Sequence, residues 1–176
     1  MDSASLNRRR SVVALLSATL LLVAASGCGG LDLGPNQQLD GTAVRVVDGD
    51  TIIADLGGRE ERVRYIGIDT PESVKPNADV ACFGPEASHE NERLLPSGTP
   101  IRLVVGAEPR DRYGRLLAYV YRRSETGKEL FVNADLVRRG FAKTMVFPPN
   151  TLHAGEFAQL RNAAHSERLG LWGSCR

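Results

Sequence analysis

Short runs of β-branched and aromatic residues, separated by polar and glycine-containing segments, dominate the chain from Thr42 onward. Such side chains favour strands, whereas pairs such as Asp48-Gly49 and Gly57-Gly58 favour the turns between strands. The predicted strands cover residues 42–47, 51–56, 62–68, 100–105 and 116–121, with a shorter sixth candidate at 129–132.

Helical patterns occur in three places. Pro85 suits the first turn of a helix, Asn133 is a predicted N-cap, and Gly140 and Gly170 are typical residues after a helix end. The predicted helices cover residues 84–95, 134–139 and 150–168, the last beginning at residue 150 or 151. Short strands that close on themselves, with few helices around them, favour an α+β, mainly β fold built on a small barrel.

The N-terminal segment has a different pattern. Three consecutive arginines at 8–10 precede an uncharged apolar run, and Gly27-Cys28 follows it. This order is typical of a signal peptide, predicted over residues 1–27. Its end, AASGC, resembles a bacterial lipoprotein signal, which implies cleavage before Cys28 and acylation of its thiol; a simple secretory peptide cut nearby is the alternative. Residues 28–40, rich in glycine and polar residues, are a predicted tether, and residues 41–176 the folded domain.

Charge and cysteine content add two constraints. Residues 1–27 contain three arginines and one aspartate, so the remainder has 19 basic and 20 acidic residues, and its overall charge does not indicate a nucleic-acid partner. Cys82 and Cys175 remain after Cys28, and in an oxidising compartment such a pair is most simply a disulfide. A Cys/His metal site is the competing interpretation, but no histidine has ligand spacing with either cysteine.

Three segments carry candidate chemistry. Asp48-Gly49-Asp50-Thr51 is typical of a hairpin, but its second carboxylate would also suit Ca²⁺ or Mg²⁺. In 64–72, RYIGIDTPE, a strand through Ile68 would place Arg64 at one end and two carboxylates just past the other. Pro71 keeps Thr70 extended and can expose its carbonyl.

The third segment, DRYGR at 111–115, is typical of a turn through Gly114. It presents Arg112, Tyr113 and Arg115 together, and these groups suit phosphate oxygens. Each of the three segments alone is equally consistent with a charged turn.

In this order, DGDT, R-x₄-DTPE and DRYGR, with FGPEA between them, resemble the staphylococcal nuclease (thermonuclease) family over about residues 44–172. The resemblance implies an OB-type five-stranded barrel with three helices that binds Ca²⁺ and cuts nucleic acid. It implies calcium ligands at Asp50, Asp69 and the Thr70 carbonyl, with Asp48 acting through water. Glu72 matches the general base, Arg64 and Arg115 the arginines on the scissile phosphate, and Arg112 and Tyr113 the contacts to a neighbouring phosphate.

One segment departs from the family pattern. FAKTMVFPPN is a residue shorter and lacks the tyrosine that stacks on the base, so Phe147 is the remaining candidate for stacking.

The sequence therefore predicts a monomeric, extracytoplasmic, calcium-dependent phosphodiesterase anchored at the cell membrane through lipid, or secreted. Its expected substrate is single- or double-stranded DNA, with RNA as an alternative, cut at the 5′-oxygen–phosphorus bond to leave 3′-phosphates. A non-catalytic copy that binds nucleic acid or protein is the first alternative, and a structural envelope lipoprotein the second. A binding-only copy would be expected to lose some of Arg64, Glu72 and Arg115, and all three are present.

Overall fold

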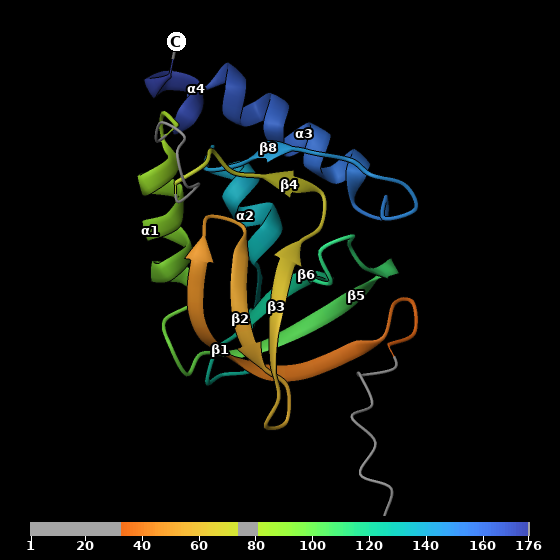
Figure 1. Ribbon diagram of the computed structural model, residues 1–176. Coiled ribbons are helices and arrows are strands. Elements are labelled where there is room, and N and C mark those ends of the chain that lie inside the picture. Colours follow the sequence, from red (N-terminus) through yellow and green to blue (C-terminus); the bar gives the residue numbers. More distant parts are fainter. Residues whose placement is uncertain (1–32, 74–80, 176) are drawn as a thin grey trace, which may run out of the picture. The chain divides into compact units, whose positions relative to one another are not determined.

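A computed structural model describes residues 33–73 and 81–175 (Figure 1). The predicted signal peptide, Cys28 and the first part of the predicted tether lie outside the described residues. Among the described helices, none has the length and apolar character needed to cross a membrane.

Five strands close into a barrel (Figure 1). Antiparallel pairing joins them in the order β3-β2-β1-β5-β6, and a parallel pairing of β3 with β6, in which Val63 lies opposite Leu116, closes the ring. The barrel strands are β1 (Gln38–Asp48), β2 (Thr51–Asp55), β3 (Glu60–Tyr65), β5 (Pro100–Arg110) and β6 (Leu116–Arg123). β7 (Glu129–Phe131) extends the sheet beyond β6, and β4 (Ile68–Asp69) pairs with β8 (Lys143–Thr144). The predicted OB-type barrel is confirmed.

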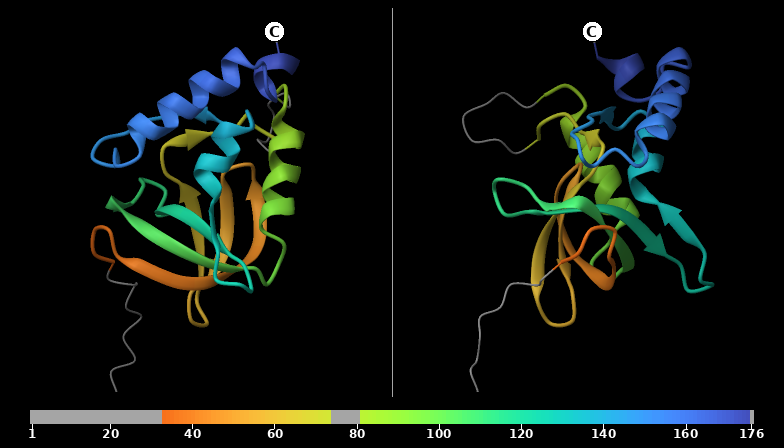
Figure 2. Two further views of the ribbon diagram at one scale, coloured as in Figure 1. Left: turned by 180° about the vertical axis from the view of Figure 1, so that it is seen from behind. Right: turned by 90° about the vertical axis from the view of Figure 1, so that its right-hand side faces the viewer.

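Helices lie along one side and across one end of this barrel (Figure 2). They are α1 (Gly84–Leu94), α2 (Val132–Arg138), α3 (Ala154–Ser166) and the single-turn α4 (Leu171–Ser174). The three predicted helices are confirmed, and α4 was not predicted. α1 packs on β1, and α2 lies between β6 and α3.

The core fills the barrel with branched aliphatic side chains. Ile52, Val63, Leu103 and Leu116, from four different strands, are fully buried. Burying each such side chain contributes about 1.5–3 kcal/mol. Phe157 of α3 is also fully buried and extends this core beneath the helices.

The predicted continuous strand over 62–68 is wrong in one respect: it breaks at Ile66-Gly67 and resumes as β4. Gly67 has φ 81°, a left-handed conformation that glycine adopts without the steric cost of a side chain. A Cβ there would lie 2.5 Å from Cε2 of Phe157, so the close approach of α3 also requires glycine. A continuous strand would have placed Arg64, Ile66 and Ile68 on one face, and the break removes this alternation.

The predicted N-cap role of Asn133 is also wrong. α2 begins two residues earlier than predicted, at Val132, with Phe131 as its N-cap residue and no side-chain cap. Asn133 is instead fully buried: its Oδ1 accepts a hydrogen bond from the Val120 amide (2.9 Å), and its Nδ2 donates one to the Ile66 carbonyl (2.9 Å). The asparagine thus ties α2 to β6 and to the chain break before β4.

The start of the domain differs from the predicted boundary at residue 41. β1 begins at Gln38, which lies opposite Val104 of β5. Leu33 is buried, and the Asn36 amide donates to the Val105 carbonyl (3.0 Å). The last residues of the predicted tether are therefore part of the fold.

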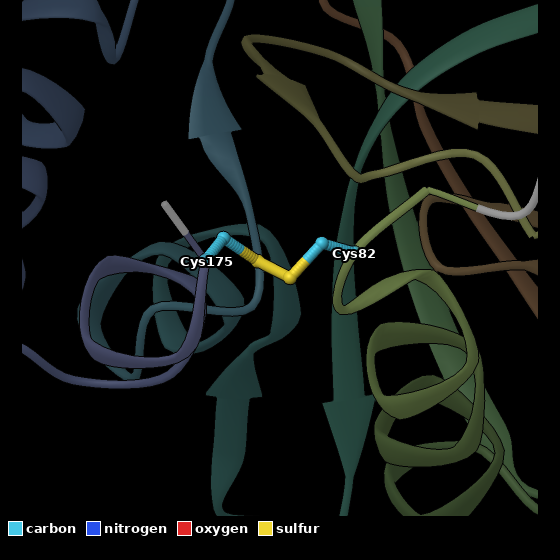
Figure 3. Close-up of a disulfide and its surroundings, with 2 residues drawn as sticks. All are labelled: Cys82 and Cys175. Carbon is cyan, nitrogen blue, oxygen red and sulfur yellow. A yellow bond between two sulfur atoms is a disulfide. The ribbon is translucent and has the colours of Figure 1, made fainter.

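A disulfide joins Cys82, just before α1, to Cys175, just after α4 (Figure 3). Their Cα atoms are 5.9 Å apart, and 93 positions separate them in sequence. The predicted pairing is present, and it ties the C-terminus of the domain to its middle.

Candidate active site

Arg64 is the centre of the site. Its Nη1 donates to the carbonyls of Tyr65 (2.8 Å) and Ile68 (2.9 Å), which the break at Gly67 brings to the same side. Its Nε lies 3.1 Å from Oδ1 of Asp50, and its Nη2 lies 3.0 Å from Oδ1 of Asp69. The same chain break that interrupts the strand therefore turns Asp69 back toward the guanidinium group.

Asp50 is held from both sides. It is 5% exposed, and its Oδ2 accepts hydrogen bonds from the Thr70 amide (2.8 Å) and hydroxyl (3.0 Å). Gly49 permits this contact, because a Cβ at that position would lie 2.6 Å from the Thr70 hydroxyl oxygen. Asp50, Asp69 and Thr70, predicted to act together, are thus brought together around Arg64.

Asp48 lies at the start of the same turn, and its Oδ1 accepts a hydrogen bond from the Asp50 amide (3.1 Å). Burial and the negative charge of Asp50 raise the pKa of the Asp48 carboxyl above its usual range. Below it, Asn91 of α1 donates to the Asp48 carbonyl (2.9 Å) and accepts from the Tyr65 hydroxyl (2.9 Å). A buried polar chain therefore connects α1 and β3 to the turn.

The second arginine of the site is held by the turn between β5 and β6. Asp111 Oδ1 accepts from the amides of Tyr113 (2.9 Å) and Arg115 (3.0 Å), and its Oδ2 accepts from Arg115 Nε (2.6 Å). Burial alone would raise the pKa of Asp111, but these hydrogen bonds outweigh it and hold the pKa below its usual value. Asp111 therefore fixes Arg115 as an aspartate-paired cation with its remaining N–H donors still available.

A cavity of about 480 Å³ lies between β3, this turn and the segment after β8. Five predicted site residues line it: Arg64, Arg112, Tyr113, Arg115 and Phe147. The two arginines of the predicted phosphate site thus face one space, although Arg64 comes from β3 and Arg115 from the turn before β6, 51 positions later in the chain. Phe147 is 67% exposed at its edge, beside Met145, where it offers an apolar surface.

Among the described residues, the lining of this cavity does not include the carboxylates predicted for the metal and the base, which are Asp48, Asp50, Asp69 and Glu72. Glu72 follows Pro71, its side chain is exposed, and its carbonyl accepts a hydrogen bond from the Ala81 amide (2.9 Å). Asp50 and Asp69 each form an ion pair with Arg64, and Arg64 lines the cavity.

Comparison with known proteins identifies the family of this chain. The family described as "Staphylococcal nuclease homologue" matches residues 62–174. The chain belongs to the staphylococcal nuclease family.

Several relatives of this staphylococcal nuclease family member are enzymes by name. It is 43% identical to a thermonuclease of Staphylococcus intermedius over 128 residues, which covers 73% of each chain. It is 40% identical to a thermonuclease of Staphylococcus hyicus over 131 residues, 74% of each chain. It is also 40% identical over 136 residues to the SPbeta prophage-derived endonuclease YokF of Bacillus subtilis, which covers 77% of this chain and 45% of that one.

The metal site that this family resemblance implies has the right donor chemistry. Hard divalent cations prefer oxygen ligands, and Asp50, Asp69 and Thr70 supply carboxylate and carbonyl oxygens. Within the described residues, no group of three or more acidic, histidine or cysteine side chains stands close enough to hold a metal alone. A cation here would therefore need the Thr70 carbonyl or water to complete its ligands.

The sequence did not predict two residues that hold the site residues in place through hydrogen bonds. Asn91 and Asp111 were not predicted as site residues, but Asn91 holds the backbone of Asp48 and Asp111 holds the side chain of Arg115. A signal for Asn91 existed, since an asparagine among the buried positions of a helix needs hydrogen-bond partners. The spacing of Asp111 and Arg115, four residues apart across a turn, was a comparable signal for their ion pair.

Proposed function

We propose that this protein is a calcium-dependent nuclease that hydrolyses phosphodiester bonds of DNA, with RNA as a second substrate. The observation that supports it best is that Arg64 and Arg115 line one cavity while Arg64 is bonded to two carboxylates. Relatives named as thermonucleases and as an endonuclease support the same reaction class.

The arginines account for binding of the phosphate. A phosphodiester is an anion that repels an attacking water or hydroxide, and guanidinium groups neutralise it while their N–H groups match its oxygens. Arg64 and Arg115 would contact the scissile phosphate, where charge increases in the transition state. Arg112 and Tyr113, whose side chains bond to each other (2.7 Å), would contact the next phosphate along the strand.

A calcium ion would be held by Asp50, Asp69 and the Thr70 carbonyl, with Asp48 bonded through water. When bound, it would add positive charge beside the phosphate and help to position water. Arg64 already holds both carboxylates on the side of the cavity, so the protein orients these ligands itself.

Glu72 is the proposed general base. Its exposed carboxylate follows directly on Thr70 and Pro71, next to the proposed calcium ligands. It would take a proton from the attacking water as the 5′-oxygen leaves phosphorus, which would give 3′-phosphate ends. Phe147 would stack on the base at the cavity edge.

The experiment that tests this function uses the purified mature domain and single-stranded DNA, with Ca²⁺ and then with EGTA. We expect cutting with Ca²⁺, its loss with EGTA, and products whose 3′-phosphates are removed by a phosphatase. A folded sample that does not cut in Ca²⁺ would overturn the proposal and favour the binding-only alternative. Equal cutting in EGTA would contradict only the proposed calcium dependence and leave the proposed nuclease activity in place.

Export to the cell surface is a further part of this proposal and rests on the N-terminal sequence. If Cys28 is acylated, full-length protein expressed in a bacterium should partition into detergent, and Cys28→Ser should move it to the aqueous phase. If both forms are found in the medium, the chain is secreted without an anchor. We expect a monomer by gel filtration in either case.

A further inference from the structure

A second hollow lies beside the first cavity, at the turn between β5 and β6. Its volume is about 330 Å³, and it is lined by Arg62, Tyr113, Gly114 and Arg115. Tyr113 and Arg115 line both hollows, so the two spaces adjoin at these residues. The proposed reaction gives no role to Arg62.

The strand register places Arg62 next to Arg115. Val63 lies opposite Leu116 at the start of the parallel β3–β6 pairing, so the residues just before them, Arg62 in β3 and Arg115 in the turn, are neighbours. Two neighbouring guanidinium groups repel each other unless an anion compensates their charge. Asp111 pairs with Arg115, and the residues lining this hollow include two arginines and no carboxylate.

Arg62 also differs from the arginines around it. Arg59 and Arg110 both pair with Glu61, at 3.2 Å and 3.0 Å. The exposed Arg62 side chain has no ion pair or hydrogen bond with any residue in 33–73 or 81–175. The protein therefore presents an uncompensated cation to a hollow that adjoins the phosphate site.

We propose that this second hollow is a subsite for a further phosphate of the polynucleotide strand, contacted by Arg62. It rests on the proposed function, because the strand is taken to enter through the cavity of Arg64 and Arg115. Arginine can donate two parallel hydrogen bonds to a phosphate. Tyr113 is 68% exposed between the two hollows, and its ring lies under the guanidinium groups of Arg112 and Arg115. Its exposed ring offers a stacking surface to a base between the two phosphates.

The subsite predicts a preference for strands of several nucleotides over the shortest substrates. Binding of a fluorescent dinucleotide and a fluorescent octanucleotide of thymidine, measured by anisotropy in EGTA, tests it without cleavage. Arg62→Gln should weaken binding of the octanucleotide about tenfold, the order expected for losing one charged hydrogen-bonding contact, and leave the dinucleotide unchanged. Each lost phosphate contact lowers the slope of log K against log salt by about 0.7 on a single strand, so the slope should fall by about that amount.

Lys128→Gln is the matched control, since it removes one exposed positive charge on the β6–β7 hairpin and Lys128 lines neither hollow. It should leave both affinities and the salt slope unchanged. The subsite is overturned if Arg62→Gln behaves like Lys128→Gln, or if it weakens both oligonucleotides equally, which would indicate only a general field effect. Cleavage of the same octanucleotide in Ca²⁺ is read separately. If the protein does not cut the octanucleotide but Arg62→Gln still weakens its binding, the nuclease proposal is overturned and the subsite stands.

Discussion

Asn91 on α1 donates a hydrogen bond from Nδ2 to the main-chain carbonyl of Asp48, which is 2.9 Å away and 43 residues earlier in the chain. The same side chain accepts a hydrogen bond from the Tyr65 hydroxyl and has no exposed surface. Helix α1 therefore carries no proposed catalytic group, yet it fixes the backbone of the turn that presents Asp48 and Asp50.

Replacing Asn91 should affect both stability and metal binding. Asn91→Ala removes the side-chain partner of the part-buried Asp48 carbonyl and of the buried Tyr65 hydroxyl, so unfolding free energy should fall by about 2–3 kcal/mol. Because the Asp48–Asp50 turn loses its anchor, the Ca²⁺ concentration for half-maximal activity should rise. Urea unfolding and calcium titration of activity measure the two effects. Tyr65→Phe is the control: it removes one hydroxyl, should cost about 1 kcal/mol, and should leave the calcium requirement unchanged.

Arg64 should matter for folding as well as for activity. It is 13% exposed, and Arg64→Ala would leave the buried Asp50 carboxylate without its cation, at a cost of roughly 3 kcal/mol. Added Ca²⁺ should recover part of this loss, because a bound cation would neutralise the same carboxylates. Thermal unfolding with and without Ca²⁺ tests both statements. In Arg115→Ala the loss should be smaller, since Asp111 is less buried than Asp50 and keeps two backbone hydrogen bonds. Equal losses in the two variants would contradict this account.

The barrel was predictable from sequence because its signals are local. β-Branched runs, Asp-Gly turns and the proline in the first turn of α1 act within a few residues, and each matched the structure. The break at Gly67 was not predictable in the same way. The run RYIGI is typical of a continuous strand, and the ring that requires glycine belongs to Phe157, which is distant in sequence.

The site residues show the same contrast between local signals and contacts that are distant in sequence. The motifs predicted a set of site residues, and the structure places Arg64 in contact with Asp50 and Asp69, and Asp50 in contact with Thr70. Asn133 was assigned to a local role because asparagine favours N-caps, but tertiary contacts to Val120 and Ile66 determine its position. Local propensity cannot reveal such partners, because they come from two other elements of the fold.

Glu72→Gln tests the proposed base. A general base contributes about 10²–10⁴-fold to rate, so turnover should fall by that order while calcium affinity is largely kept. Single-turnover cleavage and calorimetric calcium titration separate the two quantities. Glu125→Gln, at an exposed position in the turn after β6, removes the same charge and should change neither. A parallel loss of calcium affinity in Glu72→Gln would make Glu72 chiefly a metal ligand.

The disulfide should be a large contributor to stability. Cys82 and Cys175 are separated by 93 positions, and closing a loop of that length stabilises by about 4–5 kcal/mol in the chain-entropy model. The double variant Cys82→Ala/Cys175→Ala should therefore unfold at a much lower urea concentration. Intact mass after thiol alkylation without reductant should show no label on either cysteine. Two labels, or an unchanged urea midpoint, would refute the stabilising bond.

Asp111→Asn gives a prediction for pH. Hydrogen bonds from Arg115 and two amides outweigh burial and lower the folded-state pKa of Asp111 from its usual 3.8. A depressed carboxyl pKa contributes stability that is present above the unfolded-state pKa and lost as pH falls through the folded-state pKa. The variant should therefore melt at a lower temperature than the parent at neutral pH, and the difference should shrink below about pH 4.

Because an amide still accepts the backbone bonds but cannot pair with a cation, Arg115 loses its charged partner, and kcat should fall more than KM rises. Glu60→Gln, at an exposed position of β3, should show no such pH-dependent difference. A gap in melting temperature that stays constant down to pH values below the folded-state pKa would show that the carboxylate charge of Asp111 does not stabilise the turn that holds Arg115.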